Sequence, residues 1–86
     1  MPKPTVGRTV LVTGGPANSN GTHIAPGVIT RVWADSLINV TVFPDGSNQP
    51  RALTSVTLHR DEEAAVQAAQ DAGTDTVPYA FWPTIS

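Results

Sequence analysis

The chain has 86 residues with 14% charged side chains, a net charge of −2 and no cysteine. This length fits a single small domain over residues 1–86. No apolar run approaches the ~20 residues that a membrane-spanning helix needs, and without cysteine a disulfide scaffold and a thiolate zinc site are excluded. The net negative charge disfavours nucleic acid as a partner, because binding to phosphates needs an excess of basic residues.

The N-terminal part combines one strand with one long irregular segment. Alternation predicts a strand over residues 5–13, with Val6, Val10 and Val12 on one face. Residues 14–27 are rich in Gly, Asn, Ser and Pro, which predicts a long loop.

Three further strands are predicted along the chain. Residues 28–33 are dominated by β-branched and aromatic side chains. Residues 37–43 and 51–59 alternate, and in the former the face with Ile38, Val40 and Val42 is the expected core side. Tight turns separate the three strands, so we expect them to form an antiparallel meander.

The C-terminal part predicts a helix and an aromatic tail. The helix spans about residues 61–72, with Asp61 as N-cap, an Ala-rich interior and Gly73 as the C-terminal cap. Its only large apolar residue is Val66, so its packing face is thin. The tail at residues 77–86 concentrates aromatic side chains, so it either folds back as a last strand or docks into another chain.

This order of elements predicts a mainly β fold. We expect a small, partly open barrel of about five strands with one short Ala-rich helix near the C-terminus, because barrel closure limits exposed strand edges.

Two sets of residues are candidates for binding an anionic ligand. Arg31 and Arg51 are expected to lie close together in the meander, where two guanidinium groups can clamp a carboxylate or a phosphate. Gly14 and Gly15 can add backbone amides that bind an anion. The alternative is a plain turn at the glycines and arginines that extend over apolar surface.

Aromatic residues form the candidate protein interface. Trp33, Tyr79, Phe81 and Trp82 are the proposed anchors, because aromatic side chains contribute strongly to binding at protein interfaces. The alternative is that these side chains belong to the core.

Motifs for catalysis or metal binding are missing from the sequence. His23 and His59 lack the spacing of a metal site, and there is no Gly-x-Ser-x-Gly elbow or phosphate-binding loop. We therefore expect no catalytic residue, no metal and no cofactor, and we do not expect an enzyme.

Several segments resemble a family of small proteins encoded by tailed bacteriophages. They are PTVGRTV at residues 4–10, VITRVW at 28–33, NVTVFPDG at 39–46, TSV at 54–56 and WP at 82–83. The resemblance implies a phage source and an SH3-like barrel, an architecture that the strand order also predicts. It supplies no catalytic or binding residue.

These observations lead to rival functions. The first is a non-enzymatic phage accessory protein, an interaction or structural module that docks on a larger assembly such as the virion through its loop and aromatic tail, as a capsid decoration protein does. The alternative is an oligomeric binder that sequesters a nucleotide signal of host antiphage defence through Arg31, Arg51 and the loop at 14–27. A nucleic-acid-binding barrel ranks last.

The expected partners are another protein or further copies of the chain, with a small anionic ligand under the alternative. We expect neither nucleic acid nor a membrane as partner. The start of the chain shows no secretory signal, so the expected location is the virion or the host cytoplasm rather than outside the cell.

Overall fold

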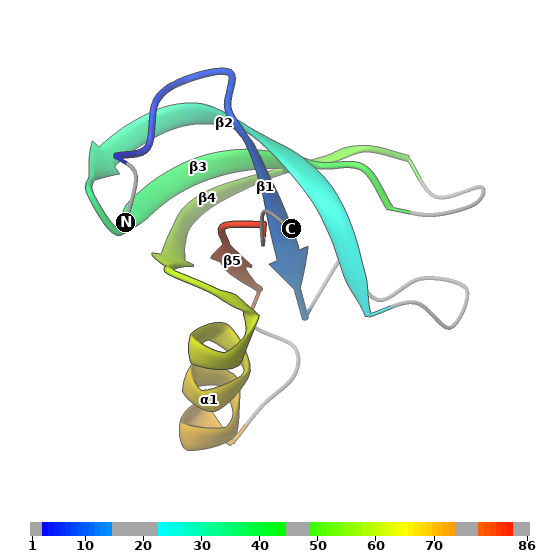
Figure 1. The fold of residues 1–86 in the computed structure, drawn as a ribbon. Helices are drawn as coiled ribbons and strands as arrows, with labels where there is room; N and C mark the ends of the chain where they lie inside the picture. Colours follow the sequence, from blue (N-terminus) through cyan, green and yellow to red (C-terminus); the bar gives the residue numbers. More distant parts are fainter. Residues whose placement is uncertain (1–2, 15–22, 45–48, 74–77, 84–86) are drawn as a thin grey trace.

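The computed structural model describes residues 3–14, 23–44, 49–73 and 78–83. Its elements are β1 (Thr9–Thr13), β2 (Ile24–Ala34), β3 (Leu37–Val42), β4 (Arg51–His59), α1 (Glu62–Ala72) and β5 (Tyr79–Phe81). The strands close into a barrel in the order β1-β2-β3-β4-β5, and α1 projects from it below β4 and β5 (Figure 1). The predicted mainly β barrel of five strands with one helix is confirmed, and it is closed rather than partly open.

The short strand β5 closes the barrel. It pairs antiparallel with β1 and parallel with β4, so that Ala80 lies opposite Val12 on one side and Leu58 on the other. Directly after β5, the backbone N–H of Trp82 donates to the carbonyl of His59 at 3.2 Å. Of the two predicted positions for the aromatic tail, the described part takes the first and packs on its own chain.

The core fills the inside of the barrel. In β3, Ile38, Val40 and Val42 are fully buried while the residues between them are partly exposed, which confirms the predicted core face. Burial of each such side chain stabilises the fold by about 1.5–3 kcal/mol. The core cluster consists of Val10, Val12, Ala25, Ile29, Ile38, Val40, Val42, Val56, Leu58, Ala80 and Trp82.

The strand β2 begins earlier than predicted. Residues 24–27, expected in the long loop, pair with β1, and the rest of that loop at 15–22 lies outside the described residues. Gly27 allows this, because a Cβ atom there would lie 2.7 Å from Val40 Cγ2. Pro26 lacks an N–H but still contributes its carbonyl, which accepts from the Phe43 N–H at 2.9 Å.

The strand β1 is shorter than predicted. The chain bends at Gly7, whose φ is 94°, and the Gly7 N–H donates to the Ile29 carbonyl at 2.8 Å. The bend places Val6 outside the strand with 67% of its surface exposed, so its predicted place on the core face is wrong. Val10 and Val12 are fully buried, as the alternation predicted.

The helix follows its predicted signals. The Asp61 carboxylate accepts from the Ala64 N–H at 2.9 Å, and Gly73 adopts φ 72° with its N–H donating to the carbonyls of Ala69 and Gln70. The helix packs against β4 and β5, and its one fully buried residue is Ala65. A small side chain therefore sets how closely α1 approaches the barrel.

The close approach at Gly27 predicts a coupled effect on stability. Gly27→Ala should lower the free energy of unfolding by about 1–3 kcal/mol, because its methyl group collides with Val40 Cγ2. In the double variant Gly27→Ala/Val40→Ala the collision is relieved, so the loss should be smaller than the sum of the two single losses. Urea unfolding of all four proteins measures this, and additive losses would contradict the steric argument.

Candidate functional site

An exposed tryptophan and an arginine stack on the outer face of β2. The guanidinium carbon of Arg31 lies 3.8 Å from the centroid of the Trp33 ring. Trp33 is 50% exposed. Arg31 was predicted as a ligand-binding residue and Trp33 as an interface anchor, and the structure brings the two together.

Asn39 holds this tryptophan in place. Its Oδ1 accepts from the Trp33 indole N–H at 2.8 Å and from the Ser55 backbone N–H at 3.0 Å. Because Trp33 is on β2, Asn39 on β3 and Ser55 on β4, one amide oxygen connects three strands. We refer to Arg31, Trp33, Asn39 and Ser55 as the Trp33 platform.

Irregularities in the strands create the platform. The pairing of β2 with β3 shifts register between Ile29 and Arg31, where β2 has an extra residue. The pairing of β3 with β4 shifts between Ile38 and Val40, where β4 has the extra residue and bulges. Within the bulge, Ser55 has a φ of 55°, an uncommon value for a residue other than glycine. The bulge presents the Ser55 N–H to the side chain of Asn39 rather than to the backbone of a neighbouring strand.

Sequence reasoning did not single out Asn39 or Ser55. The signal for Asn39 was present, because asparagine is depleted in strands and this one interrupts a run of β-branched and apolar residues. Nothing in the sequence marks Ser55 as a residue with positive φ.

The platform combines a fixed aromatic ring with an exposed cation. Arg31 is exposed, and among the residues that the structure describes it forms no ion pair. A guanidinium that stacks through its face keeps its N–H edge available for a carboxylate or a carbonyl. The arrangement is therefore suited to an apolar group placed beside an acceptor oxygen.

Arg31 and Arg51 do not form the predicted clamp. Arg31 lies opposite Asn39 and Arg51 opposite Val42, three residues further along β3. That offset is ~10 Å along the strand, and two strand spacings add ~10 Å across the sheet. Arg51 also shares the side of the sheet with the inward-facing Val42, whereas Arg31 lies on the outer side.

The other candidate ligand residues do not join the platform. Gly14 is buried at the end of β1 with a φ of 82°, so it serves a turn. Gly15 lies outside the described residues.

The tail aromatics are covered by their own chain. Phe81 and Trp82 are only 2% and 5% exposed, so the structure does not offer these rings to a partner. Trp82 belongs to the barrel core, with the Arg8 guanidinium carbon 5.1 Å from its ring centroid. Tyr79 is partly exposed, and its ring centroid lies 5.6 Å from that of His59. The core alternative therefore describes Phe81 and Trp82 better than the predicted interface role.

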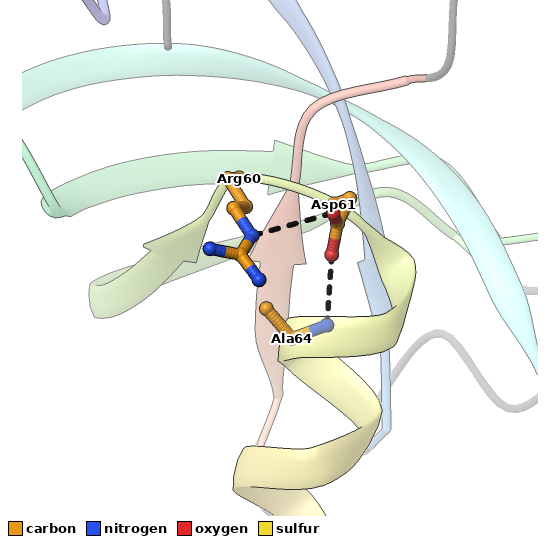
Figure 2. A network of polar contacts seen from close by, with 3 residues as sticks. All are labelled: Arg60, Asp61 and Ala64. Carbon is orange, nitrogen blue, oxygen red and sulfur yellow. Dashed lines mark hydrogen bonds and ion pairs between the residues drawn. The ribbon is translucent and has the colours of Figure 1, made fainter.

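An open groove runs between the end of β4 and α1. Its volume is about 660 Å³, and its lining includes His59 and residues of both charge signs. At the start of α1, Arg60 Nε lies 3.4 Å from Asp61 Oδ2, an ion pair drawn in Figure 2. Both side chains of this pair are largely exposed, so it contributes at most about 1 kcal/mol.

Two ring nitrogens are buried, one at the end of β4 and one directly after β5. His59 Nε2 and Trp82 Nε1 have no hydrogen-bond partner among the described residues. Desolvation by burial lowers the pKa of His59 from its ordinary value of 6.5. The neutral imidazole is therefore favoured in the folded protein.

Within residues 3–14, 23–44, 49–73 and 78–83, no three His, Asp or Glu side chains gather in a group that holds a metal ion. No described helix is long and apolar enough to cross a bilayer.

Comparisons with protein-family models, with curated proteins and with solved structures found no match. The resemblance to phage proteins therefore stays a prediction, and the only evidence for what the platform binds is the chemistry of its own residues.

The double role of Asn39 can be tested by substitution. Asn39→Ala should destabilise the fold by about 1–2 kcal/mol, because the Trp33 indole N–H and the Ser55 N–H both lose their acceptor. Hydrogen exchange of the Trp33 indole proton, followed by NMR, should become faster. Asn39→Asp keeps an acceptor oxygen and should preserve slow exchange; equal exchange in all three proteins would show that Asn39 does not hold the ring.

Burial of His59 predicts a pH-dependent stability. Because its pKa is lowered in the folded state, the unfolded chain binds more protons once the pH falls below 6.5. This contribution to stability is present above pH 6.5 and is lost as the pH falls towards the folded-state pKa. Urea unfolding on both sides of pH 6.5 should show a smaller pH effect in His59→Gln than in the wild type. His23→Gln, which removes an exposed imidazole, is the control, and an unchanged pH effect in His59→Gln would contradict the prediction.

Proposed function

We propose that the protein is a non-enzymatic interaction module that docks on a larger protein assembly through the Trp33 platform. The supporting observation is that Trp33 is half exposed yet fixed by Asn39 on β3 and by the Arg31 guanidinium. Tryptophan and arginine are enriched among the residues that dominate binding at interfaces. A ring that is already held in place loses little conformational entropy when a partner covers it.

This proposal moves the docking surface away from the tail. The sequence suggested the loop at 14–27 and the aromatic tail, but Phe81 and Trp82 are buried within their own chain. Trp33 is the one exposed residue among the four aromatic anchors that the sequence suggested. The low share of charged residues, 14%, also suits a protein that buries surface against other proteins.

The resemblance to phage proteins suggests which assembly is involved. Under that reading the protein is a phage accessory component that decorates the virion or acts in the host cytoplasm. The rival ligand-sequestering function loses support, because its two arginines lie apart along β3 and on opposite sides of the sheet.

Site-specific photo-crosslinking tests the docking surface. A photoreactive amino acid replaces Thr54, an exposed residue next to Ser55. The variant is expressed in the cells that naturally make the protein. We expect one discrete crosslinked protein, identified by mass spectrometry, whose yield falls roughly tenfold in a Trp33→Ala background, as expected for the loss of a central interface residue. Trp33→Phe should retain most of the yield because it keeps an aromatic ring.

Phe43 provides the matched control position. It is 45% exposed, close to the value for Trp33, but it follows β3 at the opposite end of the meander. Crosslinks at Phe43 without crosslinks at Thr54 would mean that another face docks, and the proposal would be wrong. It would be wrong too if the yield at Thr54 did not depend on Trp33.

A further inference from the structure

We propose that the partner of the Trp33 platform is a second copy of this chain, which docks through the acidic outer face of its helix α1. This inference rests on the proposed function, because it assigns an occupant to the same platform. The occupant follows from the match in charge and in apolar surface between two exposed faces of one chain.

The platform offers one apolar ring and one positive charge. Trp33 is 50% exposed, and Arg31 stacks on it with no ion-pair partner among the described residues. The neighbours in the platform, Asn39 and Ser55, are polar and uncharged. A complementary surface therefore needs a carboxylate beside an apolar side chain.

The outer face of α1 has this composition. Val66 is its exposed apolar side chain, with 40% of its surface accessible. Glu62 and Glu63 precede Val66 by four and three residues, which places them beside it on the helix surface. These residues surround a shallow open hollow of about 630 Å³, lined by Asp61, Glu62, Glu63, Val66, Gln67 and Gln70.

The charges of the chain are divided between these two regions. Four of the seven acidic residues lie on α1 or at its cap, namely Asp61, Glu62, Glu63 and Asp71. Only Asp61 among them forms an ion pair within the described residues, with Arg60. Three of the five basic residues, Arg8, Arg31 and Arg51, belong to the barrel. Two copies therefore attract each other when the helix of one faces the barrel of the other.

Within one copy, the acidic face of α1 and the Trp33 platform belong to different parts of the fold. Its α1 packs against β4 and β5, whereas Arg31 and Trp33 lie on β2. In the contact between copies, the Trp33 ring covers Val66 and the Arg31 guanidinium pairs with Glu62 or Glu63. Because the two surfaces differ, the contact closes as a reciprocal dimer or ring, or it continues as a chain of copies.

Charge reversal in the purified full chain tests this contact. Sedimentation velocity at low ionic strength should show self-association that weakens as salt is added. Arg31→Glu and Glu62→Arg/Glu63→Arg should each raise the dissociation constant roughly tenfold, which corresponds to about 1.4 kcal/mol. An equimolar mixture of these two variants should associate again, because each supplies the charge that the other has reversed.

Two controls keep the test specific. Arg51→Glu reverses another exposed arginine of the barrel and should leave association unchanged. Circular dichroism of each variant confirms that the barrel is folded, and Trp33→Leu should weaken association without any change in charge. A wild-type chain that stays monomeric, a mixture that fails to associate, or an Arg51→Glu effect as large as that of Arg31→Glu would overturn the inference.

The two proposals fail in different ways. A monomeric purified chain that still crosslinks to a foreign protein at Thr54 would overturn self-docking and leave the interaction module intact. A crosslink at Thr54 to a second copy would support self-docking, and it would support the interaction module only with copies of this chain as the assembly.

Discussion

The barrel depends on the backbone pairing of β5, a strand of three residues. Ala80 bridges Val12 of β1 and Leu58 of β4, and this pairing turns an open meander into a closed barrel. Closure also places Trp82 in the core, because Trp82 follows β5 directly and its N–H bonds to the end of β4. An open sheet of this size would leave two edges free to pair with other chains. Within the described part of the tail, Phe81 and Trp82 are therefore buried beside the closing strand.

Closure by so short a strand leaves most of β4 beyond it. Among the described residues, β4 pairs with β5 only at Leu58 and His59, and the rest of β4 pairs with β3 alone. The bulge at Ser55 lies in that exposed part of β4, and the register of β2 shifts around Trp33. Bulges discourage further strand pairing, because they break the regular row of backbone donors and acceptors. The same irregularities orient Trp33, so that edge protection and the candidate site share one structural cause.

The distribution of charge shows how a chain with few charged residues can still carry two regions of opposite sign. Acidic residues gather on α1, while Arg8 and Arg31 each lie over a tryptophan ring of the barrel. Cation–π stacking holds these guanidinium groups without neutralising them. A net charge of −2 therefore conceals an acidic helix and a barrel that carries exposed arginines.

The amino-acid sequence alone determined the local features of this protein. Period-two alternation placed the core face of β3, and the signals at Asp61 and Gly73 located α1 to within a residue, because both depend on neighbours within a few positions. Strand ends were less predictable: β2 begins at Ile24 because Gly27 lets two strands approach closely, a contact between residues far apart in the chain.

The sequence identified only part of the candidate site, because the site also depends on contacts between residues far apart in the chain. Arg31 and Trp33 stood out by residue type, but only the register of three strands brings Asn39 and Ser55 to them and separates Arg51 from Arg31. Register depends on bulges and on barrel closure, and one shifted residue moves a side chain to the other face of the sheet. Tertiary structure therefore decided that Phe81 and Trp82 are buried, that the two arginines lie apart, and that Trp33 is exposed yet bonded to Asn39.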